Sequence, residues 1–228
     1  MATKADAGPQ PRLPLTRERV LRAAVGLAEE HGITALSMRK LGQRLGVEAM
    51  SLYNHVANKE DVLDGMVDLV VDEIDDAVSG LDKASGDWKT AMRQRVLAAR
   101  DVLLRHPWAP GVLETRTNPS PPVLRYFDEM IGLFLDGGFS IDLTHHAMHA
   151  LGSRALGFTQ EMFDDSSEMA PTPSFVQQIA VEYPRMAEMV GGISHDADTT
   201  LGWCDDQYEF EFALDLILDG LERLRERT

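Results

Sequence analysis

The side chains between Ser37 and Leu63 have the types and the spacing needed to contact DNA. Arginine and lysine bind phosphates, an arginine fork also fits guanine, and hydroxyl and amide groups bond to base edges. A small apolar side chain can contact a thymine methyl group. The residues that we predict to contact DNA are Arg39, Ala49, Met50, Ser51, Tyr53, Asn54, His55 and Lys59.

Two helices joined by a tight turn would position these side chains. Ser37 is a good N-cap, and Leu41 and Leu45 lie four residues apart, so the helix that follows has one apolar face. Gly46 supplies the turn. A second short helix can pack against the first through the apolar residues Val47, Leu52 and Val56. This arrangement is a helix-turn-helix.

The same segment resembles the N-terminal domain of the TetR (tetracycline repressor) family of bacterial regulators. The similarity runs through a first helix, LTRERVLRAAVGLAEEHG at residues 15–32, and then through ITALSMRKLGQRLGV and SLYNHVANKEDVL. The resemblance implies a three-helix DNA-binding domain in which Arg39 reaches the major groove, Tyr53 and His55 contact phosphates, and Lys59 meets the backbone at the start of the fourth helix.

Two predicted contact positions differ from the tetracycline repressors. Ala49 stands where they carry a glutamine, which shifts base readout toward apolar contact. Asn54 stands where they carry a tryptophan. The bases that this chain reads therefore cannot be transferred from that group.

The distribution of charge also favours a DNA-binding head. The net charge is -15 over 228 residues, but residues 1–60 hold nine Lys and Arg against six Asp and Glu, a balance of +3. Residues 61–228 hold 13 against 31, a balance of -18. Phosphates repel an acidic surface, so DNA contact should be confined to the N-terminal head.

Several features indicate a cytoplasmic location. Cys204 is the single cysteine, so no disulfide can form within the chain and a reducing compartment fits. No apolar run is long enough to span a bilayer, and the N-terminal segment lacks the apolar core of a signal peptide. We therefore expect no membrane partner.

The periodicity of apolar residues predicts an all-α fold. We expect a flexible tail at residues 1–15, a three-helix helix-turn-helix domain at 16–62, and a larger helical ligand-binding and dimerisation domain at 63–228. A short irregular piece is expected at residues 108–119. The further predicted helices are 58–79, 87–105, 121–135, 140–163, 175–190 and 201–225.

The predicted last helix is apolar on more than one face. Such a helix is either a central core helix or one with a second apolar face for a partner. In the resembled family the C-terminal helix and the helix two before it form a four-helix bundle across a two-fold axis. The matching segments here are about 141–163 and 201–225, so the resemblance implies a homodimer that binds a palindromic operator.

The rest of the chain resembles the tetracycline-repressor type of C-terminal domain, through DWKTAMRQRVLAARDVLLRHPW, VLRYFDEMIGLFLDGGFS and ALGSRALGFTQEMF. This implies a small-molecule effector. Leu113 and Ser153 stand where drug-sensing members carry functional residues, including a metal-binding histidine, and only Glu161 keeps a matching carboxylate, so magnesium-tetracycline is not expected. The predicted ligand-binding residues are Trp108, Phe127, Met130, Phe134, Met148, Ser153, Phe158 and Glu161, although any apolar one can equally be core.

Other functions find less support. His145 and His149 can share a helical face with His146 nearby, but no HExxH pattern or cysteine pair accompanies them, so we predict no metal site and no cofactor. GxSxG, P-loop and GxGxxG motifs are absent, which disfavours an enzyme. The alternative function is a helical scaffold, or an enzyme with a vestigial DNA-binding head.

Overall fold

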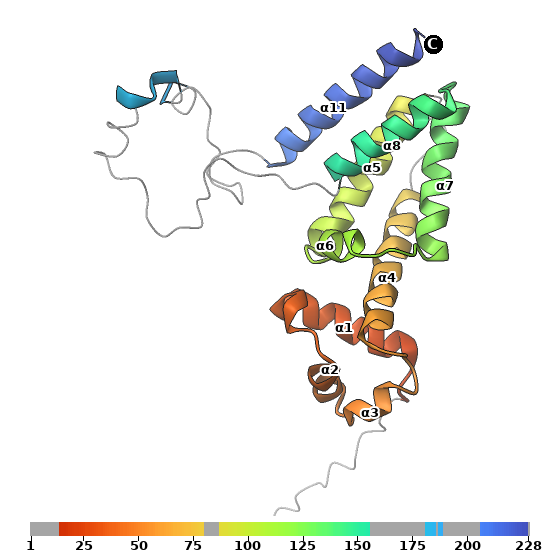
Figure 1. The fold of residues 1–228 in the computed structure, drawn as a ribbon, viewed down its shortest axis with the longest axis vertical. Helices are drawn as coiled ribbons and strands as arrows, with labels where there is room; N and C mark the ends of the chain where they lie inside the picture. The colour runs from red at the N-terminus through yellow and green to blue at the C-terminus, as the bar shows by residue number, and fades with distance from the viewer. Residues whose placement is uncertain (1–13, 80–86, 156–180, 186, 189–205, 228) are drawn as a thin grey trace, which may run out of the picture. The chain divides into compact units, whose positions relative to one another are not determined.

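The computed structural model describes residues 14–79, 87–155, 181–185, 187–188 and 206–227 (Figure 1). The regular elements within these ranges are all helices, which confirms the all-α prediction. Contacts divide the chain into two compact units. Unit 1 holds Met1–Gly86 and Gln94–Gly132, and unit 2 holds Asp87–Arg93 and Leu133–Thr228.

Unit 1 begins with three helices and a 3-10 turn, which are α1 (Arg17–His31), η1 (Ile33–Ala35), α2 (Met38–Leu45) and α3 (Ala49–Leu52). The Thr16 hydroxyl caps α1 by accepting from the Arg19 N–H at 3.2 Å. The Ser37 hydroxyl caps α2 by accepting from the Lys40 N–H at 3.3 Å. Both caps satisfy N–H groups that a helix start leaves free, and the cap at Ser37 confirms the prediction from the sequence.

The turn between α2 and α3 depends on two glycines. Gly46 ends α2 with a φ of 69°, in the left-handed region that glycine adopts without strain. Gly42 lies where α2 approaches the start of α3, and its carbonyl accepts from the Val47 N–H at 3.0 Å. A Cβ at Gly42 would lie 2.9 Å from the Val47 carbonyl oxygen. Only glycine therefore allows this approach.

The long helix α4 (Lys59–Ser79) leaves the group formed by α1, α2 and α3 (Figure 1). The Asn58 side chain accepts from the Asp61 N–H at 2.8 Å, so it caps the helix start. One face of α4 packs against α1, and the buried residues of α4 are Val62, Leu63, Gly65, Met66, Val67, Val70, Val71 and Ile74.

Three more helices follow, α5 (Trp88–Arg105), α6 (Ala109–Glu114) and α7 (Pro121–Asp136). The prediction of an irregular piece at 108–119 was wrong in part, because α6 lies inside it. Pro110 lies in the first turn of α6, where a proline loses no hydrogen bond. Burial of Ala109 and Val112 stabilises the helix.

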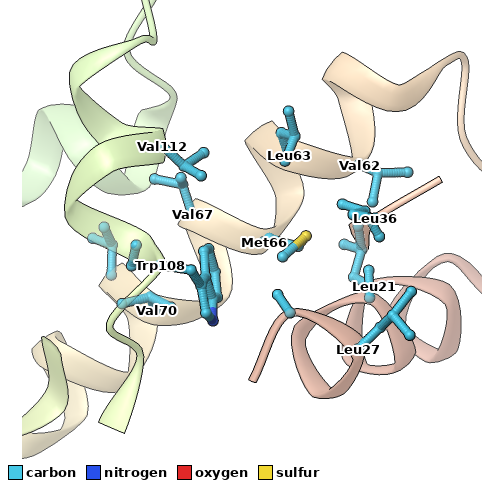
Figure 2. Packing of buried hydrophobic residues seen from close by; sticks show 14 of the residues in the cluster. Leu21, Leu27, Leu36, Val62, Leu63, Met66, Val67, Val70, Trp108 and Val112 are labelled. Carbon is cyan, nitrogen blue, oxygen red and sulfur yellow. The ribbon is translucent and has the colours of Figure 1, made fainter. Parts of the chain in front are cut away.

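A single apolar core runs through unit 1 (Figure 2). Trp108 and Val112 are directed at Val67 and Val70 of α4. The other side of α4 faces α1 and the segment around Leu36, and Met66 is fully buried there. The helix α4 is thus shared between the helix-turn-helix and α6.

Unit 2 is built on α8 (Ile141–Ala155) and α11 (Asp206–Arg225), which pack against each other. Trp88, Phe134 and Phe139 form an aromatic cluster in this unit, with ring centroids 4.5 to 5.7 Å apart. The Trp88 indole N–H donates to the Glu222 carboxylate at 2.8 Å. The parts of the predicted helices at 156–163 and 201–205, and most of 175–190, lie outside the described residues.

Candidate nucleic-acid interface

The helix α3 and the turn after it carry six of the eight residues predicted to contact DNA, and three of the six are exposed. Met50 is 74% exposed and Tyr53 is 43% exposed, while Leu52 between them is fully buried. Ala49 and Ser51 are half-buried. A short helix anchored by Leu52 therefore presents Met50 to the outside and leaves Ala49 and Ser51 partly accessible.

The helix α3 is shorter than expected, because Val47 and Val56, which we expected to anchor it together with Leu52, lie outside Ala49–Leu52. Tyr53, Asn54 and His55 form a turn after Leu52, closed by a bond from the His55 N–H to the Leu52 carbonyl at 2.9 Å. Asn54 is exposed and His55 is half-buried. The turn brings the chain to the start of α4, where Lys59 is exposed.

Positive charge on this face is available to a partner. Arg39 and Lys40 on α2 are exposed, as is Lys59, and within the described ranges none of the three forms an ion pair. Other basic groups of the head are occupied: Arg22 pairs with Glu18 at 3.0 Å, and Arg44 with Glu30 at 2.6 Å. The unpaired cations thus lie on the elements that carry the predicted DNA contacts.

A third ion pair, between Arg17 and Asp61, fixes the turn between α3 and α4. The Arg17 guanidinium donates to both oxygens of Asp61, at 2.8 and 2.7 Å. Asp61 also accepts from the Ala57 N–H at 2.7 Å. The hydrogen bond from Arg17 holds the pKa of the Asp61 carboxyl below its usual value. The pair joins the first turn of α1 to the first turn of α4, so it positions the segment that carries Tyr53 and His55.

The arrangement suits binding of phosphates and base edges. The exposed thioether of Met50 on α3 and the exposed hydroxyl and amide of Tyr53 and Asn54 on the turn after it are flanked by unpaired cations. No three or more His, Cys, Asp or Glu side chains in the described ranges are placed to hold a metal ion. None of the helices in those ranges could cross a membrane.

The predicted ligand-binding residues fall into both units. In unit 1, Trp108 and Met130 are buried, and Phe127 is 40% exposed. In unit 2, Phe134 is fully buried in the aromatic cluster with Trp88.

The other predicted ligand-binding residues belong to unit 2. Met148 is half-buried, and Ser153 is exposed, with its hydroxyl donating to the His149 carbonyl at 2.8 Å. Phe158 and Glu161 lie outside the described residues. The set therefore stays a prediction.

A buried arginine was missed when the sequence was read. Arg95 is 6% exposed, on the face of α5 that also buries Met92, Val96 and Ala99. Arg95 lies three residues after Met92 and four before Ala99, which places it on the apolar stripe of the helix. This position indicates a paired arginine, because a charged residue on an apolar stripe is rarely buried without a partner.

Comparison with known proteins connects the head and the rest of the chain to one family. The pattern described as "Bacterial regulatory proteins, tetR family" matches residues 20–66. The pattern described as "Tetracyclin repressor-like, C-terminal domain" matches residues 82–225.

Individual relatives agree. An HTH-type transcriptional regulator from Saccharopolyspora erythraea is 36% identical over 125 residues, 55% of this chain and 51% of that protein. HTH-type transcriptional repressor DrrR1 from Streptomyces coeruleorubidus is 28% identical over 230 residues, 95% of this chain and 80% of that protein. The crystal structure of a possible TetR family transcriptional regulator from Streptomyces coelicolor A3(2) has a TM-score of 0.72 at 28% identity, covering 91% of this chain and 99% of that one.

Proposed function

The chain belongs to the TetR family of bacterial regulatory proteins, and we propose on that premise that it is a ligand-responsive transcriptional repressor. It binds a palindromic operator as a homodimer and is released when a small molecule binds its C-terminal domain. The observation that carries the proposal is the exposed α2 and α3 surface with the unpaired cations Arg39, Lys40 and Lys59.

Residues 16–62 serve as the DNA-binding domain, residues 1–15 as a tail, and residues 63–228 as the regulatory and dimerisation domain. The proposed boundary at residue 62 divides the chain by function. It does not divide the apolar core, because the core of unit 1 continues from α1 through α4 to Trp108. This continuity supports α4 as the element that transmits ligand binding to the head. A hundredfold change in operator affinity requires about 2.7 kcal/mol of coupling between the two sites.

We predict that Arg39→Ala weakens operator binding by about tenfold or more, because an arginine contact to a guanine or phosphate contributes about 1–3 kcal/mol. Fluorescence anisotropy would be measured on a duplex from the DNA just upstream of the gene, with a scrambled duplex beside it, at several salt concentrations. If Arg39 contacts a phosphate, its removal lowers the slope of log affinity against log salt concentration by about 1. If it contacts a base, its removal relaxes the sequence preference.

The matched control is Arg22→Ala, which removes an exposed arginine already paired with Glu18 on α1. This variant should bind as the original chain does. An equal loss of operator affinity in the two variants would show that Arg39 does not contact DNA. A flat salt response with no sequence preference would overturn the DNA-binding proposal and favour the helical scaffold.

The homodimer is proposed from the apolar surface of α11. Phe212 and Leu216 are 53% and 55% exposed and lie four residues apart, on the side of α11 away from the fully buried Leu214 and Leu218. On α8, Ile141 is 81% exposed. An exposed apolar face of this kind marks a contact surface. A four-helix bundle of α8 and α11 from two copies would cover it.

We expect Leu216→Glu to raise the dissociation constant of the dimer by at least about tenfold, since a buried unpaired carboxylate costs more than about 1.4 kcal/mol. Analytical ultracentrifugation over a concentration series measures this change. Leu104→Glu on α5 is the matched control, because Leu104 is also 55% exposed and lies outside the proposed interface. Similar effects of the two substitutions would contradict a dimer through α11.

A further inference from the structure

Three histidines lie close together on the exposed side of α8. His145, His146 and His149 are all exposed, and the ring centres of His145 and His149 lie 4.6 Å apart. Residues four apart lie on one side of a helix, one turn above the other, so these two rings share a face. In the described part of the chain neither of the two imidazoles forms an ion pair. The ring nitrogens of this pair are therefore available to a ligand.

The separation of the two rings suits a shared metal ion. Two imidazoles on one tetrahedral zinc ion, each bound at about 2.0–2.1 Å, have ring centres about 5 Å apart. The 4.6 Å between His145 and His149 is close to that value, so small rotations of the side chains bring one nitrogen of each to the same ion. Imidazole suits zinc, nickel and copper, whereas magnesium and calcium prefer oxygen ligands.

One copy of the chain supplies too few ligands for a structural zinc site, which takes four protein ligands. No group of three or more His, Cys, Asp or Glu side chains within the described ranges is placed to hold a metal. His146 does not complete the pair, because the next residue along a helix is turned by about 100°. Its Nε2 lies 3.8 Å from the Asp142 carboxylate. The two missing ligands therefore come from another molecule.

The surroundings of the histidine pair favour a second copy of the chain as that molecule. Ile141 lies one turn before His145 on the same side of α8 and is 81% exposed. The helix α8 packs against α11, whose exposed Phe212 and Leu216 belong to the proposed dimer surface. Charge is a second argument. Each copy has a net charge of -15, which opposes association, and a divalent cation between two copies offsets part of this repulsion.

We propose that His145 and His149 from each of two copies bind one zinc ion, as a four-histidine site on the two-fold axis of the dimer. A two-fold axis brings the same pair from each copy to one place, which supplies four ligands. The inference rests on the proposed function, because it uses the homodimer through α8 and α11. It adds stabilisation of that dimer by a metal ion. The site departs from the sequence-based prediction of no metal site, which considered motifs within one chain.

The test compares the full chain in EDTA, in Zn²⁺ and in Mg²⁺ by analytical ultracentrifugation over a concentration series. We expect Zn²⁺ to lower the dissociation constant of the dimer by at least about tenfold relative to EDTA, and Mg²⁺ to leave it unchanged. Elemental analysis of the dialysed protein should find one zinc ion for every two copies. One zinc ion per copy with no change in the dimer, or no bound zinc, would overturn the proposal.

Two variants test the ligands one at a time. His145→Ala and His149→Ala each remove one ligand from each copy, so each should abolish the effect of Zn²⁺ on the dimer and on the melting temperature. Both positions are exposed and alanine favours a helix, so α8 should still form. His146→Ala is the matched control, because His146 is an exposed histidine of the same helix. It should keep the response to Zn²⁺, and an equal loss in all three variants would contradict the proposed ligand pair.

The measurement in EDTA separates failure of the zinc site from failure of the proposed function. A chain that dimerises equally well in EDTA and in Zn²⁺, with the same melting temperature in both, loses the zinc site alone. A chain that stays monomeric in both conditions loses the homodimer as well. Operator titration is independent of both results in the presence of EDTA, because it reports on the helix-turn-helix of unit 1 and not on α8.

Discussion

Gly42→Ala is expected to reduce operator affinity by about a hundredfold while leaving the helical content of the chain nearly unchanged. A Cβ at Gly42 would lie 2.9 Å from the carbonyl oxygen of Val47 and 3.2 Å from both N and Cα of Ala49. These are backbone atoms, so they can move only if α3 moves away from α2. Overpacking of this kind costs about 1–3 kcal/mol. A loss of about 1.4 kcal/mol in each of two heads multiplies to about a hundredfold.

The measurement is the same anisotropy titration, with circular dichroism to report helical content. Gly132→Ala is the matched control, because Gly132 also lies inside a helix but has no atom within 4 Å of an added Cβ. That change should leave operator binding intact and stabilise α7 by up to about 1 kcal/mol. If Gly42→Ala bound the operator normally, the close approach of α2 and α3 would not be needed to present α3.

The parts of the fold that were predicted from the sequence depend on local signals. The N-caps Thr16 and Ser37 and the left-handed Gly46 each act within a few residues, so a single chain segment contains the whole signal. The apolar stripe of α1 is equally local, and Val20 and Ala24 are both fully buried. Residue types at helical spacing were therefore enough to predict these elements.

The parts that were missed depend on contacts between distant segments. The helix α6 follows His106-Pro107 and contains Pro110, and it is stabilised by packing on α4, about forty residues earlier in the chain. Arg44 forms an ion pair with Glu30, which lies fourteen residues away in the sequence. The charge count of the head includes both side chains, but in the structure the Arg44 and Glu30 charges neutralise each other. Charge available to DNA is thus a property of pairing and not of sequence.

The buried charges of unit 1 show the same dependence on distant contacts. Asp75 and Glu129 flank Arg95 from positions 20 and 34 residues away. No short motif joins these three residues, so the ligand-binding candidates taken from the sequence were apolar and aromatic residues with Ser153 and Glu161, and they did not include this cluster. The arginine on an apolar stripe was the only local sign.

Trp108→Ala is expected to lower the free energy of unfolding by about 3–5 kcal/mol, as large-to-small changes of buried aromatic residues do. Trp108 is 6% exposed and contacts the core beside Val70 of α4 (Figure 2). Its ring also meets His106 edge-on, with centroids 5.9 Å apart. Urea unfolding of the two proteins at equal concentration measures the difference.

Trp108→Phe is the informative companion to this variant. The indole N–H of Trp108 is buried and, within the described ranges, has no hydrogen-bond partner. Phenylalanine keeps most of the apolar contact and removes that unsatisfied donor, so its loss should stay below about 1.5 kcal/mol. A loss as large as that of alanine would show that the indole makes a bond that stabilises the fold.

The pair of variants also separates the two roles open to Trp108. If the residue only fills the core between α4 and α6, Trp108→Phe changes neither operator release nor the response to small molecules. If it binds the effector, as the sequence predicted, the unsatisfied N–H is a donor held for the ligand, and phenylalanine weakens the response while the protein stays folded. A Trp108→Phe protein with unchanged stability and a weakened response to small molecules would support a role for Trp108 in effector binding.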